Sequence, residues 1–142
     1  MLEQYGKDNV GLVFQNASST IDTDSEYQLT INDRGNYFPS PSVFVYTLPN
    51  IMLGEICIKH KIFGENALMI VPRFDANALS KHLAALFDEK RIKCCIAGWV
   101  EQHNDYYDAF VFLAESVENN QNGICLINTS QQLENTYSQL NN

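Results

Sequence analysis

The sequence predicts an α/β fold in which helices pack on a mixed sheet, and residues 64–101 carry most of that prediction. The apolar run Ala67–Val71 is stopped by Pro72, which cannot continue a paired interior strand. From Asp75, which is the expected N-cap, the apolar residues repeat at helical spacing, and Ile92–Val100 is again apolar and rich in β-forming residues. This order is a β-turn-α-β unit, in which the turn after the first strand usually carries the chemistry.

The segment before this unit supplies a first strand and a first helix. Val10–Phe14 is continuously apolar, which predicts a strand covered on both faces. The polar residues that follow predict a turn into a helix, with Ser19 or Thr20 as the N-cap. The next loop contains Tyr37 and Phe38, which could anchor an interface or pack under a neighbouring loop.

A second helical segment precedes the central unit. Ser42–Lys59 is typical of a buried helix that is broken or begun afresh at Pro49. Thr47 is the expected N-cap of its second part, because proline is tolerated in the first turn of a helix. Gly54 predicts a point where another backbone approaches closely.

Further strands follow the central unit. Tyr106–Glu115 is apolar and follows a short polar connection, which predicts a hairpin with the preceding strand. Ile124–Ile127 is a last short strand, so a five-stranded sheet is expected. From about residue 129 the chain becomes a polar tail with a weakly amphipathic helix. The apolar residues at helical spacing in this tail are Leu133, Tyr137 and Leu140.

Length and composition indicate one domain. A chain of 142 residues that is 45% hydrophobic can bury roughly two-thirds of its unfolded surface, so residues 1–142 should share a core. The first ten residues lack a basic segment followed by an apolar one, and no apolar run approaches the ~20 residues that cross a bilayer. We therefore expect a cytoplasmic protein.

The cysteines and histidines do not indicate a metal site. The four cysteines lack paired zinc-type spacing, and adjacent Cys94 and Cys95 alternate faces on a strand, so reduced core thiols are expected. Cys57 and His60 share a helix face, but two ligands do not make a metal site. His103 has aspartates nearby in the sequence but no nucleophile. We expect no metal and no cofactor.

Several runs resemble the core of a β-ketoacyl synthase, a condensing enzyme of the thiolase fold. That family typically has Gly-Pro-Asn, a strand, a nucleophilic Cys on the strand-to-helix turn, an Ala-rich helix and a strand ending in Ala-Gly-Gly-x-Glu. The similar runs here are G-E-N-A-L-M-I-V, C-C-I-A-G-W-V-E, G-L-V-F-Q-N-A-S-S and F-V-Y-T-L-P-N-I-M-L-G-E-I-C-I-K-H-K-I-F-G-E-N. The resemblance covers roughly Val10 to Ser116 and implies a thiolase-like half-domain, the N-terminal half of that fold.

The turn departs from the family pattern. Its six residues are Pro72, Arg73, Phe74, Asp75, Ala76 and Asn77. A thiolate at a helix N-terminus is the nucleophile that accepts an acyl group from a thioester, and this turn has no cysteine. Asp75 is a poor substitute, because a carboxylate at a helix start is stabilised as a charge. The family's other catalytic residues come from its C-terminal half, which this sequence does not match. The resemblance therefore implies a protein without condensing activity.

Three functions are compatible with these features. The first is a noncatalytic ketosynthase-like subunit of fatty-acid or polyketide-type biosynthesis, paired with itself or with an active condensing enzyme, as chain-length factors are. The second is a homodimeric acyl or small-molecule binding module. The third is an enzyme of another class that uses Asp75, Arg73 or His82. Family dimers pair through the strand before the turn, which here comprises Ala67, Leu68, Met69, Ile70 and Val71.

The charge distribution bears on partners. A net charge of −8 argues against nucleic-acid binding, yet residues 59–93 carry seven basic and four acidic side chains, or +3, while the remainder carries −11. This asymmetry would suit an acidic partner such as an acyl carrier protein. The alternative is a solvated helix end with charged loop corners. The candidate docking residues are Lys59, Lys61, Arg73 and Lys81.

Overall fold

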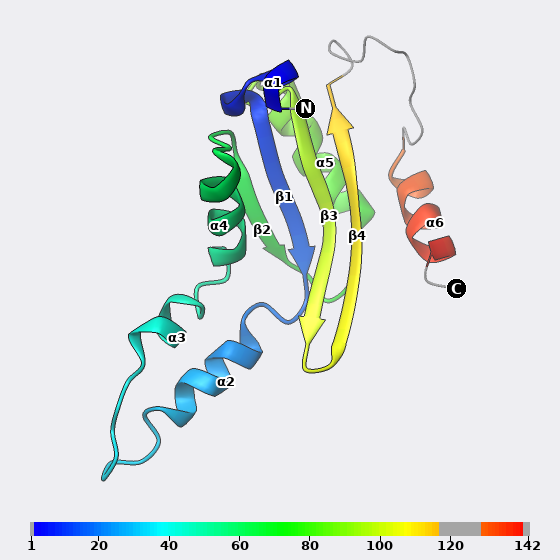
Figure 1. Ribbon diagram of the computed structural model, residues 1–142. Helices are drawn as coiled ribbons and strands as arrows, with labels where there is room; N and C mark the ends of the chain where they lie inside the picture. Colours follow the sequence, from blue (N-terminus) through cyan, green and yellow to red (C-terminus); the bar gives the residue numbers. More distant parts are fainter. Residues whose placement is uncertain (1, 117–128, 141–142) are drawn as a thin grey trace.

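The fold was described from a computed structural model, which covers residues 2–116 and 129–140 (Figure 1). Its elements in chain order are α1 Leu2–Tyr5, the short 3-10 helix η1 Lys7–Asn9, β1 Val10–Asn16, α2 Ile21–Leu29, α3 Pro41–Val45, α4 Ile51–His60, β2 Asn66–Ile70, α5 Ala76–Asp88, β3 Cys94–His103, β4 Tyr106–Glu115 and α6 Ser130–Leu140. The β-turn-α-β unit is therefore β2-α5-β3, as the apolar periods predict.

The sheet is mixed and has the strand order β2-β1-β3-β4. β1 is parallel to both β2 and β3, and β4 returns antiparallel to β3 as the predicted hairpin. Gly98 permits this hairpin, because a Cβ at that position would lie 1.9 Å from the Phe110 carbonyl oxygen. The described residues contain four strands where five were predicted, and the proposed fifth, Ile124–Ile127, lies outside them.

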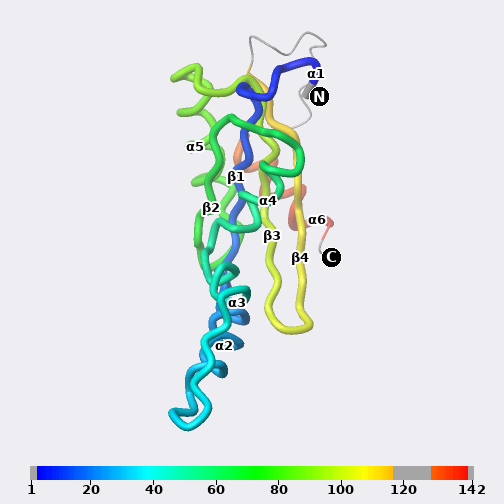
Figure 2. The backbone as a smooth tube through the Cα atoms, turned by 60° about the vertical axis from the view of Figure 1, so that its left-hand side comes forward, coloured from blue at the N-terminus to red at the C-terminus, as the bar shows by residue number. Residues whose placement is uncertain are grey.

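Helices cover both faces of the sheet. α5 and α6 pack on one face, and α4 packs on the other (Figures 1 and 2). All seven residues of β1 are buried, as its continuous apolar sequence predicts. On α5, Leu79, Leu83 and Leu86 are buried at helical spacing, and the helix ends before Lys90, whose positive φ of 56° stops it.

The predicted helical segment Ser42–Lys59 is divided, as expected, into two helices, α3 and α4, on either side of Pro49. The expectation that it is buried was wrong for its first part, because no residue of α3 is buried. Thr47 does not cap α4, because its hydroxyl donates to the Phe44 carbonyl at 2.8 Å and Asn50 occupies the N-cap position. Gly54 marks no close backbone approach, since a Cβ there would meet nothing within 4 Å.

The segment between β1 and α4, residues 17–50, forms an arm that contains α2 and α3. It leaves the sheet at the carboxyl end of β1 and leans toward the β2 side of the molecule (Figures 1 and 2). α2 and α3 have no buried residue, although the Tyr27 and Phe44 rings lie 5.4 Å apart between them. Thr20 is the N-cap of α2 by position, as predicted, but its side chain makes no capping hydrogen bond.

Candidate functional site at the turn between β2 and α5

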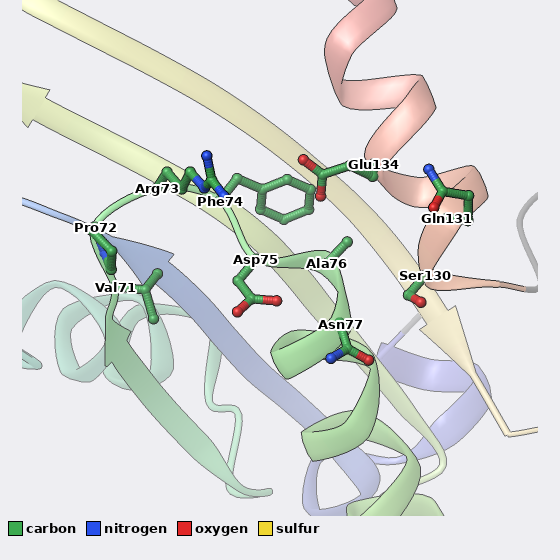
Figure 3. Close-up of a pocket in the computed structure, with 10 residues that line it drawn as sticks. All are labelled: Val71, Pro72, Arg73, Phe74, Asp75, Ala76, Asn77, Ser130, Gln131 and Glu134. Atoms are coloured by element: carbon green, nitrogen blue, oxygen red, sulfur yellow. The ribbon is translucent and has the colours of Figure 1, made fainter.

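The turn from Val71 to Asp75 links β2 to α5 at the carboxyl end of the parallel strands. A cavity of ≈ 560 Å³ opens here, lined by residues 71–77 and by Ser130, Gln131 and Glu134 of α6 (Figure 3). All six turn residues singled out from the sequence line it. The sequence did not predict that α6, which starts 53 residues after Asn77, would supply the opposite wall.

Gln15, on β1, fixes the backbone of this turn. Its side chain is fully buried, and its amide donates to the Asp75 carbonyl at 3.1 Å while its carbonyl oxygen accepts from the Asp75 N–H at 3.0 Å. A buried side-chain amide that pairs with both the N–H and the C=O of one residue leaves neither of its polar groups unsatisfied. The backbone at the start of α5 is therefore held against the central strand, and the Asp75 N–H is not free to bind a ligand.

The Asp75 side chain caps α5. Its carboxylate accepts a hydrogen bond from the Ala78 N–H at 2.8 Å, which confirms the predicted N-cap. The positive end of the helix dipole stabilises this carboxylate as an anion. The place where a helix N-terminus would activate a nucleophile or bind an anion is thus occupied by the protein's own carboxylate.

Other side chains give the cavity a mixed character. Phe74 is buried and directs its ring toward α6, with its centroid 4.8 Å from that of Tyr137 (Figure 3). Arg73 is exposed at the rim, and Glu134 is half-buried on α6. The cavity therefore combines an apolar base with one cation and two carboxylates, those of Asp75 and Glu134.

A hydrogen-bonded group fastens α6 beside this cavity. The Trp99 indole N–H donates to the Asp108 carboxylate at 3.0 Å, and the Tyr137 hydroxyl donates to the same oxygen. Burial raises the pKa of Tyr137, and its hydrogen bond to Asp108 raises it further. The phenol therefore stays a donor, and it connects α6 to the β3–β4 hairpin. Sequence reasoning assigned no role to Asp108.

His82 is not part of the site. It lies seven residues after Asp75 on α5, which corresponds to roughly 10 Å along the helix axis. It is half-buried and does not line the cavity. Of the three residues named for an enzyme of another class, Asp75 and Arg73 therefore line the cavity and His82 does not.

The four candidate docking cations are not gathered into one patch. Lys59 and Lys61 lie at the C-terminal end of α4, just before β2 begins, whereas Arg73 follows the end of β2. The two groups are therefore at opposite ends of the sheet. Lys81 is exposed on α5, across the sheet from α4. Docking of an acidic partner to these residues stays a prediction.

Two carboxylates attach the arm to the sheet, and sequence reasoning missed both. Asp22 on α2 lies 2.8 Å from His103 Nδ1 and accepts from the Asn104 N–H at 2.7 Å. Glu101, buried at the end of β3, accepts from the N–H groups of Ala17 and Ser18 at 2.5 and 3.2 Å. The only sequence signal for Glu101 was its position closing the C-C-I-A-G-W-V-E run.

The described cysteines lie away from the turn. Cys57, Cys94 and Cys95 are free and buried, as expected for core thiols, while Cys125 is outside the described residues. Burial raises the pKa of Cys95 to about 12, and the adjacent Cys94 adds to the rise. Such thiols stay protonated at neutral pH and are poor nucleophiles.

Within residues 2–116 and 129–140, no three or more His, Cys, Asp or Glu side chains gather as a metal site. No helix in the same described ranges is long and apolar enough to cross a membrane.

Comparison with known proteins supports the fold. No family model and no curated protein matches the chain. A solved structure of the ishigamide ketosynthase/chain length factor is similar, with a TM-score of 0.69 over 80% of this chain and 13% sequence identity. The chain spans 37% of the length of that protein. This similarity confirms the ketosynthase-like α/β fold that the resemblance in sequence implies.

Proposed function

We propose that this chain is a noncatalytic ketosynthase-like subunit of fatty-acid or polyketide-type biosynthesis. It pairs through β2 with a second copy or with an active condensing enzyme. The observation that carries the proposal is the state of the turn: Asp75 caps α5, Gln15 holds the backbone, and the turn contains no cysteine. The likeness to a ketosynthase/chain length factor supports the pathway assignment.

The absence of acyl transfer follows from the chemistry of the turn. Asp75 is hydrogen-bonded and stabilised as an anion, so its oxygen is a weak nucleophile toward a thioester. The buried thiols are protonated at neutral pH. Incubation of the protein with an acyl thioester, followed by intact mass measurement, should give no acyl adduct. A stoichiometric adduct on a residue of the turn would contradict this part of the proposal.

Pairing through β2 is supported by the edge position of that strand. The Glu65 carbonyl and the Val71 N–H both bond to β1, so alternation along the strand points the N–H and C=O groups of Leu68 and Ile70 outward. The Ile70 side chain is 49% exposed. An apolar edge with outward-facing backbone groups is a template for another strand.

Ile70→Pro tests the pairing directly. Proline removes one outward N–H and leaves the bonds to β1 in place, whereas Ile70→Thr removes the apolar side chain and keeps the N–H. By sedimentation equilibrium, the wild-type protein and Ile70→Thr should be dimers and Ile70→Pro a monomer. A wild-type monomer that also fails to bind a cysteine-containing synthase would rule out pairing.

The cavity favours a second function, the binding of an acyl group or small molecule. Its volume of ≈ 560 Å³ falls within the ~300–1,000 Å³ of small-molecule sites, and Arg73 at its rim could hold an anionic end. Native mass spectrometry of the protein incubated with short-chain fatty acids tests this function. Arg73→Ala should weaken the binding of a fatty acid in the cavity, whereas Lys61→Ala, at the other end of the sheet, should leave that binding unchanged.

A further inference from the structure

We infer that the arm of one copy packs against the C-terminal end of α4 in a second copy, so that the dimer interface combines two β2 strands with two exchanged arms. This inference rests on the proposed pairing through β2. It adds a surface, a partner and a set of residues to that pairing. Five features support it: the exposed apolar surface of the arm, its attachment to the sheet, the small size of β2, the symmetry that pairing imposes, and the complementary surface at the end of α4.

The arm exposes apolar surface that it cannot cover by itself. Neither α2 nor α3 has a buried residue, while Phe44, Val45 and Leu48 are all exposed. Monomeric soluble proteins rarely expose apolar patches larger than a few hundred Å². A segment that orders without a core of its own is stabilised by packing against something else.

The arm is nevertheless held at a defined place. Asp22 binds the β3–β4 hairpin through His103 and Asn104, and the Thr20 hydroxyl donates to the Thr47 carbonyl at 3.1 Å. The first contacts attach α2 to the hairpin, and the last one joins the beginning of the arm to the segment after α3. The arm is therefore held in a fixed direction, toward the β2 side (Figure 1).

β2 alone is too small to hold a stable dimer. It has five residues, or about 17 Å of strand, whereas stable interfaces bury about 1,600 Å² in total. Edge pairing of two such strands covers a small part of that area. A dimer formed through β2 needs a second surface beside the strand.

Symmetry places the arm of one copy beside a specific part of the other. A two-fold axis normal to the sheet makes the two β2 strands antiparallel and keeps both α4 helices on one face. The carboxyl end of one β2, where the arm begins, then lies beside the amino end of the other β2. At that amino end are the last turn of α4 and the loop 61–65.

This region carries a complementary surface. Ile58 and Phe63 are 80% and 66% exposed, and the Phe63 backbone is fixed by a 3.0 Å hydrogen bond to the Lys7 carbonyl. Lys59 and Lys61, which lie between these two residues in the sequence, are exposed and add positive charge. The arm has four carboxylates and one arginine, a net charge of −3. The apolar and acidic arm thus complements the apolar and basic end of α4, so these lysines face the arm of the second copy.

Three substitutions separate this inference from the pairing on which it rests. Ile58→Glu places a charge at the proposed arm contact, and Ile70→Pro blocks the strand edge. Val111→Glu on β4 is the control: it also introduces a charge, and the Val111 side chain is 49% exposed, as is that of Ile70. Each variant is first checked for an unchanged circular dichroism spectrum. The dimer dissociation constant is then measured by sedimentation equilibrium.

We expect Ile58→Glu and Ile70→Pro to raise the dissociation constant about tenfold or more, and Val111→Glu to leave it unchanged. A normal dimer with Ile58→Glu, together with loss of the dimer in Ile70→Pro, would overturn the arm contact and retain the strand pairing. A wild-type monomer would overturn the arm contact and the pairing of β2 between two copies, and would leave only the pairing with a condensing enzyme.

A photo-crosslink gives an independent test. Phe63 is replaced by benzoylphenylalanine, and the variant is mixed with isotopically labelled wild-type protein before irradiation. The arm contact predicts crosslinked peptides from residues 41–50 of the labelled chain. Crosslinks confined to the same chain, or to other labelled segments, would contradict the exchange of arms.

Discussion

Gln15 and Asp75 exchange two hydrogen bonds across 60 residues of sequence, at 3.1 and 3.0 Å, between a fully buried side chain and the backbone N–H and C=O of one residue. The central strand of the sheet thereby sets the position of the turn on which the candidate site is built. Because the side chain of Asp75 is used in capping α5, this residue is held by both its backbone and its carboxylate.

Gln15→Leu should destabilise the protein by ~1–3 kcal/mol, because it removes the hydrogen-bond partners of the Asp75 N–H and C=O and leaves a close-fitting apolar side chain in their place. Urea unfolding followed by circular dichroism measures the loss. Gln139→Leu, at an exposed position of α6, is the control and should leave the midpoint unchanged. Equal midpoints for both variants would mean that the turn does not depend on the amide.

Asp75 should act as a structural cap and not as a reacting group. Asp75→Ala should cost ~1 kcal/mol of unfolding free energy, whereas Asp75→Asn, whose side chain also caps well, should cost little. Thermal unfolding of the two variants provides the comparison. If Asn and Ala were equally destabilising, the negative charge itself, and not the Ala78 hydrogen bond, would be what matters at this position.

Alkaline pH should destabilise the fold through its buried thiols. Burial raises the pKa of Cys95 from 9.0 to about 12, so the folded state keeps its proton where the unfolded state loses it. The contribution of this protonated thiol to the free energy of unfolding is complete below pH 9.0. It is lost as the pH rises toward 12, by at most about 1.4 kcal/mol per pH unit.

Unfolding free energies measured from neutral pH to about pH 10 test this prediction. The Cys95→Ala protein should show a shallower alkaline decline than the wild type. A flat profile is not expected for the variant, because burial also raises the pKa of Cys94 and Tyr137. Parallel profiles for the two proteins would show that Cys95 does not titrate as its burial implies.

Tyr137→Phe should loosen α6. The change removes the hydroxyl that donates to Asp108 and keeps the ring packed against Phe74, so a loss of ~1 kcal/mol is expected. Limited proteolysis should cut α6 faster, and the fluorescence of Trp99, which shares Asp108, should shift. Tyr106→Phe, at an exposed position on β4, is the control. Unchanged cleavage of α6 would show that aromatic packing alone holds it.

The sequence by itself determined the elements whose signals lie within a few residues. The β2-α5-β3 unit, the Asp75 cap and the β3–β4 hairpin follow from apolar periods, a capping residue and a short polar connection, all of which act locally. The helical tail was likewise readable from the spacing of its apolar residues. These features depend on neighbours in the chain and little on the rest of the fold.

Only the tertiary structure decided how distant polar groups meet. Gln15, Asp22 and Asp108 each bind groups that strand order and register bring near, and no local pattern specifies such partners. Burial is decided in the same way: Ser42–Lys59 has the composition of a core helix, yet the sheet accommodates only α4, and α3 remains in an arm that no other part of the described chain covers. A side chain's environment depends on which surfaces the whole fold brings together, and a single sequence does not encode that locally.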